Sequence, residues 1–101
     1  MRKVAVVTGN RAEFGLLKNT IERIHASKAL QLQLLVTGAH LFKNTGLTIQ
    51  EIKDAKLPIT EEIAIEIEDS INGVTNGIGE TTKQFGKAFN KHQPDIVVLL
   101  G

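Results

Sequence analysis

The sequence predicts an α/β fold in which a parallel sheet carries helices on both of its faces. Four strand-like segments alternate with three helical ones along the 101 residues, an order typical of parallel strands joined by crossover helices. The first two strand segments are almost continuous apolar runs, as in central strands that are covered on both sides. A glycine follows the first strand, and a helical pattern begins immediately. These observations favour a doubly wound sheet with strand order 3-2-1-4.

The expected strands cover residues 3–8, 32–37, 59–68 and 95–101, and the expected helices cover residues 11–26, 47–55 and 74–90. In the first helix, helical spacing predicts an apolar stripe, made of Leu16, Leu17, Thr20, Ile21 and Ile24. In the third helix, the residues predicted to face the core are Val74, Ile78, Phe85 and Phe89. Pro94 ends this helix before the last strand.

The third strand segment has the alternating pattern of a half-exposed edge strand. Ile63, Ile65 and Ile67 alternate with Ala64 and with glutamates. Glutamates at that spacing suit an edge that is protected against pairing with another chain. We interpret them as a solvated face and assign them no chemistry.

The fourth strand segment, residues 95–101, is apolar on both faces after its first residue. The 3-2-1-4 order places it at the other edge of the sheet, where an all-apolar strand is an aggregation hazard. We therefore expect residues 1–101 to be an amino-terminal domain that is truncated after its fourth strand, with further chain beyond Gly101.

Composition excludes several classes of function. The net charge is +1, so bulk electrostatics gives no reason to expect nucleic-acid binding, and four phenylalanines without Trp or Tyr do not make a base-stacking platform. No apolar run is long enough to span a membrane, and no signal-peptide pattern follows Met1. The absence of cysteine fits a reducing cytoplasm. We expect a cytoplasmic protein without nucleic-acid or membrane partners.

The junction after the first strand predicts an anion-binding site. A helix start has unpaired N–H groups and about half a positive charge, so a phosphate gains hydrogen bonds there. Asn10 and Glu13 have the spacing of a capping box, which needs no ligand to explain it. Arg11 opposes the helix dipole in the first turn, an arrangement that an anionic ligand would explain. Gly9 and Gly15 match neither the dinucleotide nor the P-loop fingerprint.

A second loop leaves the sheet at the same edge and contains His40. This histidine could polarise a hydroxyl, bind phosphate or hydrogen-bond its own loop, and the residues alone leave these alternatives open. Lys43 and Asn44 fit a solvated loop. His25 and His92 lie at helix ends, where histidine suits the dipole, and we interpret both as structural. No metal-ligand spacing is present, and we expect no metal or other cofactor.

Three stretches together resemble one known family. They are residues 8–17 (TGNRAEFGLL), residues 36–41 (VTGAHL) with 46–48 (GLT), and residues 94–101 (PDIVVLLG). In order and spacing they are similar to the amino-terminal part of hydrolysing UDP-N-acetylglucosamine 2-epimerases. The resemblance extends over essentially the whole chain.

The resemblance implies a Rossmann-like first domain of a two-domain glycosyltransferase B fold, with a UDP-sugar substrate in the cleft between the domains. It implies elimination of UDP across C1 and C2, then hydration to N-acetylmannosamine for sialic acid synthesis, in an enzyme that is a homo-oligomer at full length. Arg11 matches the arginine that contacts UDP, and Gly9 and Asn10 match the turn beside the ligand. His40 matches a histidine near the cleft and is assigned a positioning role.

The resemblance also marks what these residues lack. The family places its candidate acid/base groups and most UDP-binding residues after the fourth strand, so we assign no catalytic residue here and expect this chain alone to be inactive. Asn10 stands where many members have threonine or serine. Alternatives are a UDP-diacetylbacillosamine 2-epimerase of legionaminic acid synthesis, a glycosyltransferase of the same fold, and a noncatalytic flavodoxin-like binding module.

Overall fold

The computed structural model describes residues 1–38, 49–63 and 70–100; the side chain of Arg11 also lies outside the described part. The described strands form one parallel sheet in the order β3-β2-β1-β4, which confirms the predicted order. The strands are β1 (Arg2–Thr8), β2 (Leu30–Thr37), β3 (Glu61–Ile63) and β4 (Ile96–Val98). The helices are α1 (Arg11–Ala26), α2 (Ile49–Asp54) and α3 (Ile71–His92).

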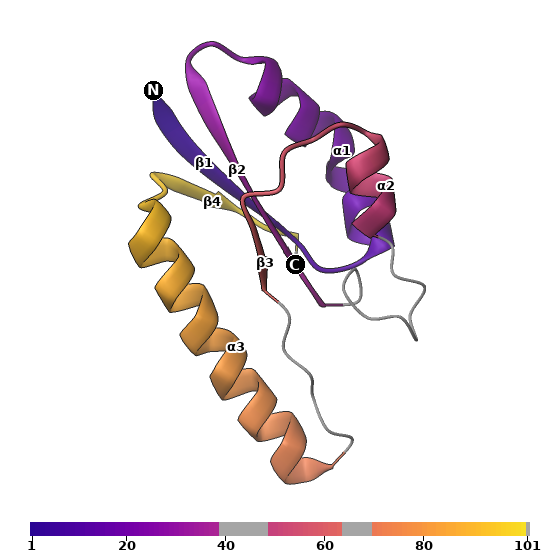
Figure 1. The fold of residues 1–101 in the computed structure, drawn as a ribbon, viewed down its shortest axis with the longest axis vertical. Helices are drawn as coiled ribbons and strands as arrows, with labels where there is room; N and C mark the ends of the chain where they lie inside the picture. Colours follow the sequence, from indigo (N-terminus) through magenta and orange to yellow (C-terminus); the bar gives the residue numbers. More distant parts are fainter. Residues whose placement is uncertain (39–48, 64–69, 101) are drawn as a thin grey trace.

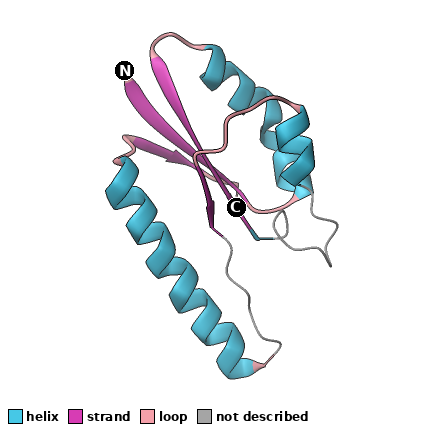
Figure 2. Cartoon of the chain, in the orientation of Figure 1, coloured by secondary structure: helices cyan, strands magenta, loops and turns pink. Residues whose placement is uncertain are grey.

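The helices lie on both faces of the sheet, as the sequence predicts. Helices α1 and α2 cover one face and α3 runs along the other (Figure 1). Each described crossover from strand to strand contains a helix, which gives the α/β character seen in Figure 2. Within the described residues, no helix is both long and apolar enough to cross a bilayer.

Helix α1 has the predicted bounds but a different buried stripe. Phe14, Leu17, Ile21 and Ile24 are buried against β1 and β2, and a fully buried side chain of this size stabilises the fold by about 1.5–3 kcal/mol. The prediction that Leu16 belongs to the buried stripe of this helix is wrong, because its side chain is 72% exposed. Phe14 takes its place, because residues 14, 17, 21 and 24 share one side of a 3.6-residue helix while residue 16 points about 100° away.

Thr20 was also wrongly assigned to the buried stripe, since it is exposed.

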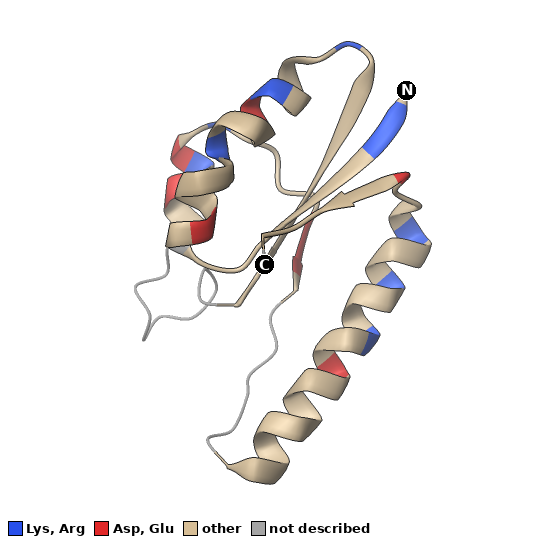
Figure 3. Cartoon of the chain, turned by 180° about the vertical axis from the view of Figure 1, so that it is seen from behind, with Lys and Arg blue, Asp and Glu red and all other residues tan. Residues whose placement is uncertain are grey.

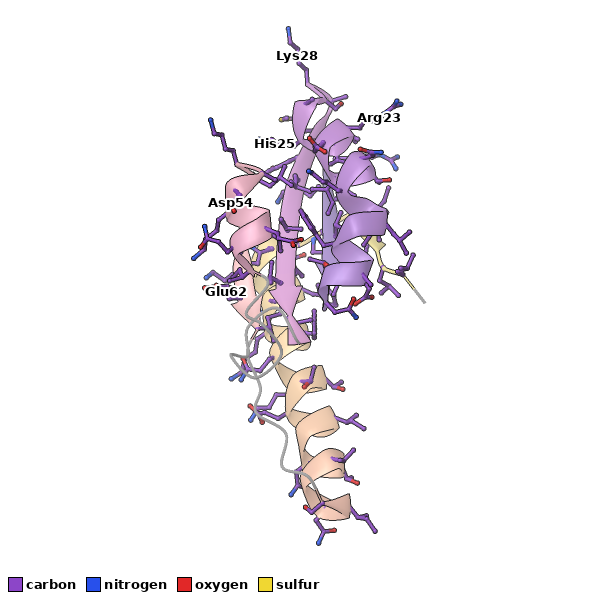
Figure 4. All side chains as sticks on the ribbon, turned by 90° about the vertical axis from the view of Figure 1, so that its right-hand side faces the viewer. Arg23, His25, Lys28, Asp54 and Glu62 are labelled. Carbon is purple, nitrogen blue, oxygen red and sulfur yellow. The ribbon has the colours of Figure 1, made fainter. Side chains whose placement is uncertain are left out.

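The ends of α1 are set by local chemistry. Asn10 caps the amino end, and Arg23 and His25 lie in the last turn, where positive charge suits the helix dipole. Arg23 and His25 lie at the end of α1 that is remote from its start (Figure 4).

Helix α3 begins earlier than the sequence predicts, because Ser70 caps it by accepting a hydrogen bond from the Gly73 amide at 2.9 Å. The prediction that Val74 and Ile78 face the core is wrong. They are 43% and 60% exposed, because the first half of α3 extends past the ends of the strands (Figure 1).

The second half of α3 packs on the sheet, and Ala88 is buried there. Phe85 and Phe89 are half-buried and form a tilted ring pair with centroids 5.8 Å apart. The helix ends at His92 with Gln93 in the left-handed conformation, and Pro94 follows, as expected.

Both edge strands begin later than predicted, and β4 also ends earlier, at Val98. Strand β3 begins at Glu61 with Ile63 buried, and residues 64–68 of the predicted strand lie outside the described part. Two hydrogen bonds fix the start of β4 to β1. The Lys3 amide donates to Asp95 Oδ2, and the Asp95 amide donates to the Lys3 carbonyl, both at 2.8 Å. Ile96, Val97, Leu99 and Leu100 are exposed to solvent, which agrees with the expected apolar edge.

Glu61 joins β3 to the end of α3. Its carboxylate oxygen lies 3.2 Å from Lys91 Nζ and 3.1 Å from His92 Nε2. The adjacent His92 imidazole and the neighbouring Lys91 charge lower the pKa of Glu61 below its usual range. The glutamates of this segment were predicted to be simply solvated; Glu62 is exposed (Figure 4), whereas Glu61 forms a structural ion pair.

We expect Glu61 to make stability depend on pH. Because its pKa is lowered on folding, its contribution is present above the unfolded pKa and is lost as pH falls through the folded pKa. Glu61→Gln should lower the free energy of unfolding at pH 7 by about 0.2–1 kcal/mol, as for other partly exposed ion pairs. In urea titrations the difference should shrink as the pH falls from 7 to 3, because the Glu61 carboxylate becomes protonated. Glu62→Gln is the matched control, and an equal loss at both pH values would contradict this role.

Candidate functional site

The turn between β1 and α1 is closed by two hydrogen bonds that run in opposite directions. Asn10 Oδ1 accepts from the Glu13 amide at 2.9 Å, and Glu13 Oε1 accepts from the Gly9 amide at 3.1 Å. In a regular capping box the glutamate would accept from the capping residue itself. Here it reaches one residue further back. The predicted cap at Asn10 is confirmed, and the Glu13 carboxylate leaves the Asn10 amide to other acceptors.

The end of β2 packs directly against this turn. Gly38 has a positive φ of 63°, and a Cβ atom at this position would lie 2.6 Å from the carbonyl oxygen of Gly9. A Cβ on Gly9 would lie 3.0 Å from Glu13 Oε1. Gly38 therefore has a steric reason to lack a side chain, whereas a Cβ at Gly9 would crowd only the end of the Glu13 side chain. The two glycines bring the first two strand ends into close contact.

A pocket of about 380 Å³ opens beside this contact. Its walls come from the carboxyl ends of the strands, from the start of α1 and from α3. The lining residues are Val7, Gly9, Glu13, Thr37, Phe85, Phe89, Leu99 and Leu100. Ligands of doubly wound sheets bind at this end of the strands, so the pocket lies where the fold predicts a ligand.

The structure describes the surroundings of some predicted site residues and not of others. Gly9 lines the pocket and Asn10 caps α1. Arg11 is the first residue of α1, and its side chain lies outside the described part. His40, Lys43 and Asn44 also lie outside the described residues, so their predicted roles stay predictions.

Three features of the site were missed from the sequence. The positive φ of Gly38 could have been suspected, because a glycine directly after a strand often marks such a conformation. The bond from Gly9 to Glu13 departs from the usual capping pattern, and nothing in the sequence reveals it. The contribution of Phe85 and Phe89 to the pocket depends on how α3 packs across the sheet.

The electrostatics of the site are local. Acidic and basic residues are interspersed over α1 and α2, whereas most charged positions on α3 are basic (Figure 3). In the described residues, no group of three or more His, Cys, Asp or Glu is arranged to hold a metal ion. The first-turn amides of Arg11 and Ala12 have no acceptor one turn earlier in the helix. This end of α1 is therefore able to hold an anion through backbone donors.

Comparison with known proteins identifies the family. A family model described as UDP-N-acetylglucosamine 2-epimerase matches residues 22–101. The chain belongs to this family. The predicted resemblance is confirmed over most of the chain.

The 2-epimerase relatives include enzymes named for two different sugars. The chain is 34% identical to a UDP-N,N'-diacetylbacillosamine 2-epimerase (hydrolyzing) of Legionella pneumophila and 38% identical to a GDP/UDP-N,N'-diacetylbacillosamine 2-epimerase (hydrolyzing) of Campylobacter jejuni. It is 30% identical to a UDP-N-acetylglucosamine 2-epimerase of Neisseria meningitidis. These matches cover 99–100% of the chain but 26–27% of each relative. The chain thus spans about a quarter of their length.

The fold agrees with a solved 2-epimerase structure. The UDP-GlcNAc 2-epimerase of Neisseria meningitidis, crystallised with UDP-GlcNAc, superposes with a TM-score of 0.72 at 17% identity. The match covers 96% of this chain and 25% of the solved chain. This likeness supports the predicted Rossmann-like architecture of the glycosyltransferase B type.

We expect the contact between Gly9 and Gly38 to be sensitive to a single methyl group. Gly38→Ala places a Cβ against the Gly9 carbonyl in a strained conformation and should lower the free energy of unfolding by about 1–3 kcal/mol. Gly15→Ala is the matched control, because it is helical and has no atom within 4 Å of the added Cβ; it should stabilise the chain by about 0.5–1 kcal/mol. Urea denaturation measures both. Equal effects of the two variants would contradict the close approach.

Proposed function

We propose that this chain is the amino-terminal domain of a hydrolysing 2-epimerase that acts on a UDP-linked acetamido sugar. Family membership supports the reaction class, and the share of each relative that the chain covers supports a domain of a larger enzyme. The exposed apolar side chains of β4 fit a strand that further polypeptide covers. The observation that carries the site assignment is the turn at Gly9 and Asn10, which opens α1 beside the pocket.

In this proposal the start of α1 holds the diphosphate of the substrate. Backbone amides of the first turn donate to phosphate oxygens, and Arg11 adds a charge-assisted bidentate contact. Gly9 allows the ligand to approach the backbone closely, and Asn10 keeps the turn capped. His40 is proposed to position the sugar.

The proposed reaction removes UDP and then adds water. A base takes the proton from C2 while the bond from C1 to the UDP oxygen breaks, which gives a glycal and UDP; hydration of the glycal gives the free 2-epimeric sugar. Elimination needs a proton acceptor and stabilisation of the departing phosphate. The α1 turn supplies only the second, so we propose that residues 1–101 alone are inactive. No residue of this chain is assigned as catalytic.

The identity values favour the diacetylbacillosamine derivative as the sugar, because the two relatives named for it are 34% and 38% identical against 30% for the relative named for UDP-N-acetylglucosamine. UDP-N-acetylglucosamine, which would yield N-acetylmannosamine for sialic acid synthesis, is the second candidate. The choice of sugar places the enzyme in legionaminic or sialic acid synthesis. A homo-oligomeric state and a cytoplasmic location stay predictions.

Product analysis tests the proposed reaction. The full-length protein that contains these residues should convert one of the two UDP-sugars to UDP and the free 2-epimeric sugar without any acceptor, and water labelled with ¹⁸O should place the label at C1. The 101-residue chain should give no product from either substrate. UDP release only in the presence of an acceptor would indicate a glycosyltransferase, and no reaction with either sugar would favour a binding module.

A further inference from the structure

We infer that Glu13 is a positioning residue that holds the Gly9 turn in the conformation that receives the diphosphate. The inference rests on the proposed function, because it assigns a role at the same site. Its starting observation is the 3.1 Å bond from the Gly9 amide to Glu13 Oε1. The partly buried Glu13 carboxylate thus bonds the residue before the helix cap.

Gly9 is held from two directions. Glu13 accepts its amide proton, and Gly38 from β2 lies against its carbonyl. The turn therefore joins three elements at one residue, and neither β1 nor α1 can shift its end without breaking one of these contacts. Asn10 Oδ1 bonds the Glu13 amide at 2.9 Å and completes the ring.

The Glu13 carboxylate accepts from the Gly9 amide and not from the Asn10 amide, which affects the amides available to a ligand. A glutamate in the regular capping arrangement would occupy the amide of Asn10. By bonding Gly9 instead, Glu13 leaves the amide of Asn10, with those of Arg11 and Ala12, to an incoming anion. The turn is fixed before the ligand arrives, which lowers the cost of ordering it on binding.

Because Glu13 is negatively charged, it acts through Gly9 and does not contact the ligand directly. A carboxylate repels a diphosphate at short range, so the useful property of this side chain is its hydrogen-bond acceptor. Glutamine keeps an acceptor oxygen on a side chain of the same length and removes the charge. Alanine removes both.

The test measures UDP affinity and exchange of the Gly9 amide in the full-length protein. Glu13→Ala should weaken UDP binding about tenfold, the scale of a lost charge-assisted hydrogen bond, and should speed hydrogen exchange at Gly9. Glu13→Gln should bind UDP as tightly as the parent or more tightly, with Gly9 still protected. Glu22→Ala removes an exposed carboxylate from the same helix and should change neither measurement.

The outcomes separate this inference from the proposed function. If Glu13→Ala changes neither UDP affinity nor Gly9 exchange, or if Glu13→Gln weakens UDP binding as much as Glu13→Ala, the positioning role is overturned. If the parent protein does not bind UDP, the proposed function fails together with the ligand named here. Hydrogen exchange at the Gly9 amide is measured without ligand, so in either case it reports whether Glu13 restrains Gly9.

Discussion

The parallel pairing of β1 with β2 is the constraint on which the site depends. Its register places Thr8 beside Val36, so that the strands end together and Gly9 and Gly38 meet immediately afterwards. A side chain at Gly38 would overlap the carbonyl of Gly9. The sheet thereby fixes where α1 begins, and the apolar stripe of α1 fixes its direction across β1 and β2.

The same constraint explains why one end of the sheet is suited to an anion. Amides of the first helical turn lack intrahelical acceptors, and the capping bonds of Asn10 and Glu13 leave several of them available. The adjoining pocket is lined largely by apolar side chains of β1, α3 and the segment after β4. Backbone donors beside an apolar wall suit a ligand that has both a phosphate and a less polar portion.

The sequence was sufficient for the strand order, the bounds of α1 and the cap at Asn10, because these depend on local patterns and on the rules of parallel sheets. The sequence was insufficient for features that depend on how the helices pack against the sheet. Leu16 and Phe14 are both apolar, and only the rotation of α1 against the sheet determines which is buried. Val74 and Ile78 have core-like spacing, but α3 extends beyond the strands there. The bond from Gly9 to Glu13 depends on a backbone geometry that no residue pattern specifies.

The central claim is that the start of α1, with Arg11, holds the diphosphate of a UDP-sugar. The most direct measurement is UDP affinity by calorimetry for the full-length protein and for two arginine variants. Arg11→Ala should weaken UDP binding at least tenfold, about the scale of a lost charge-assisted bond. Arg23→Ala, in the last turn of the same helix and remote from the site (Figure 4), should bind as the parent does. Retention of the parent's UDP affinity by Arg11→Ala would contradict the account.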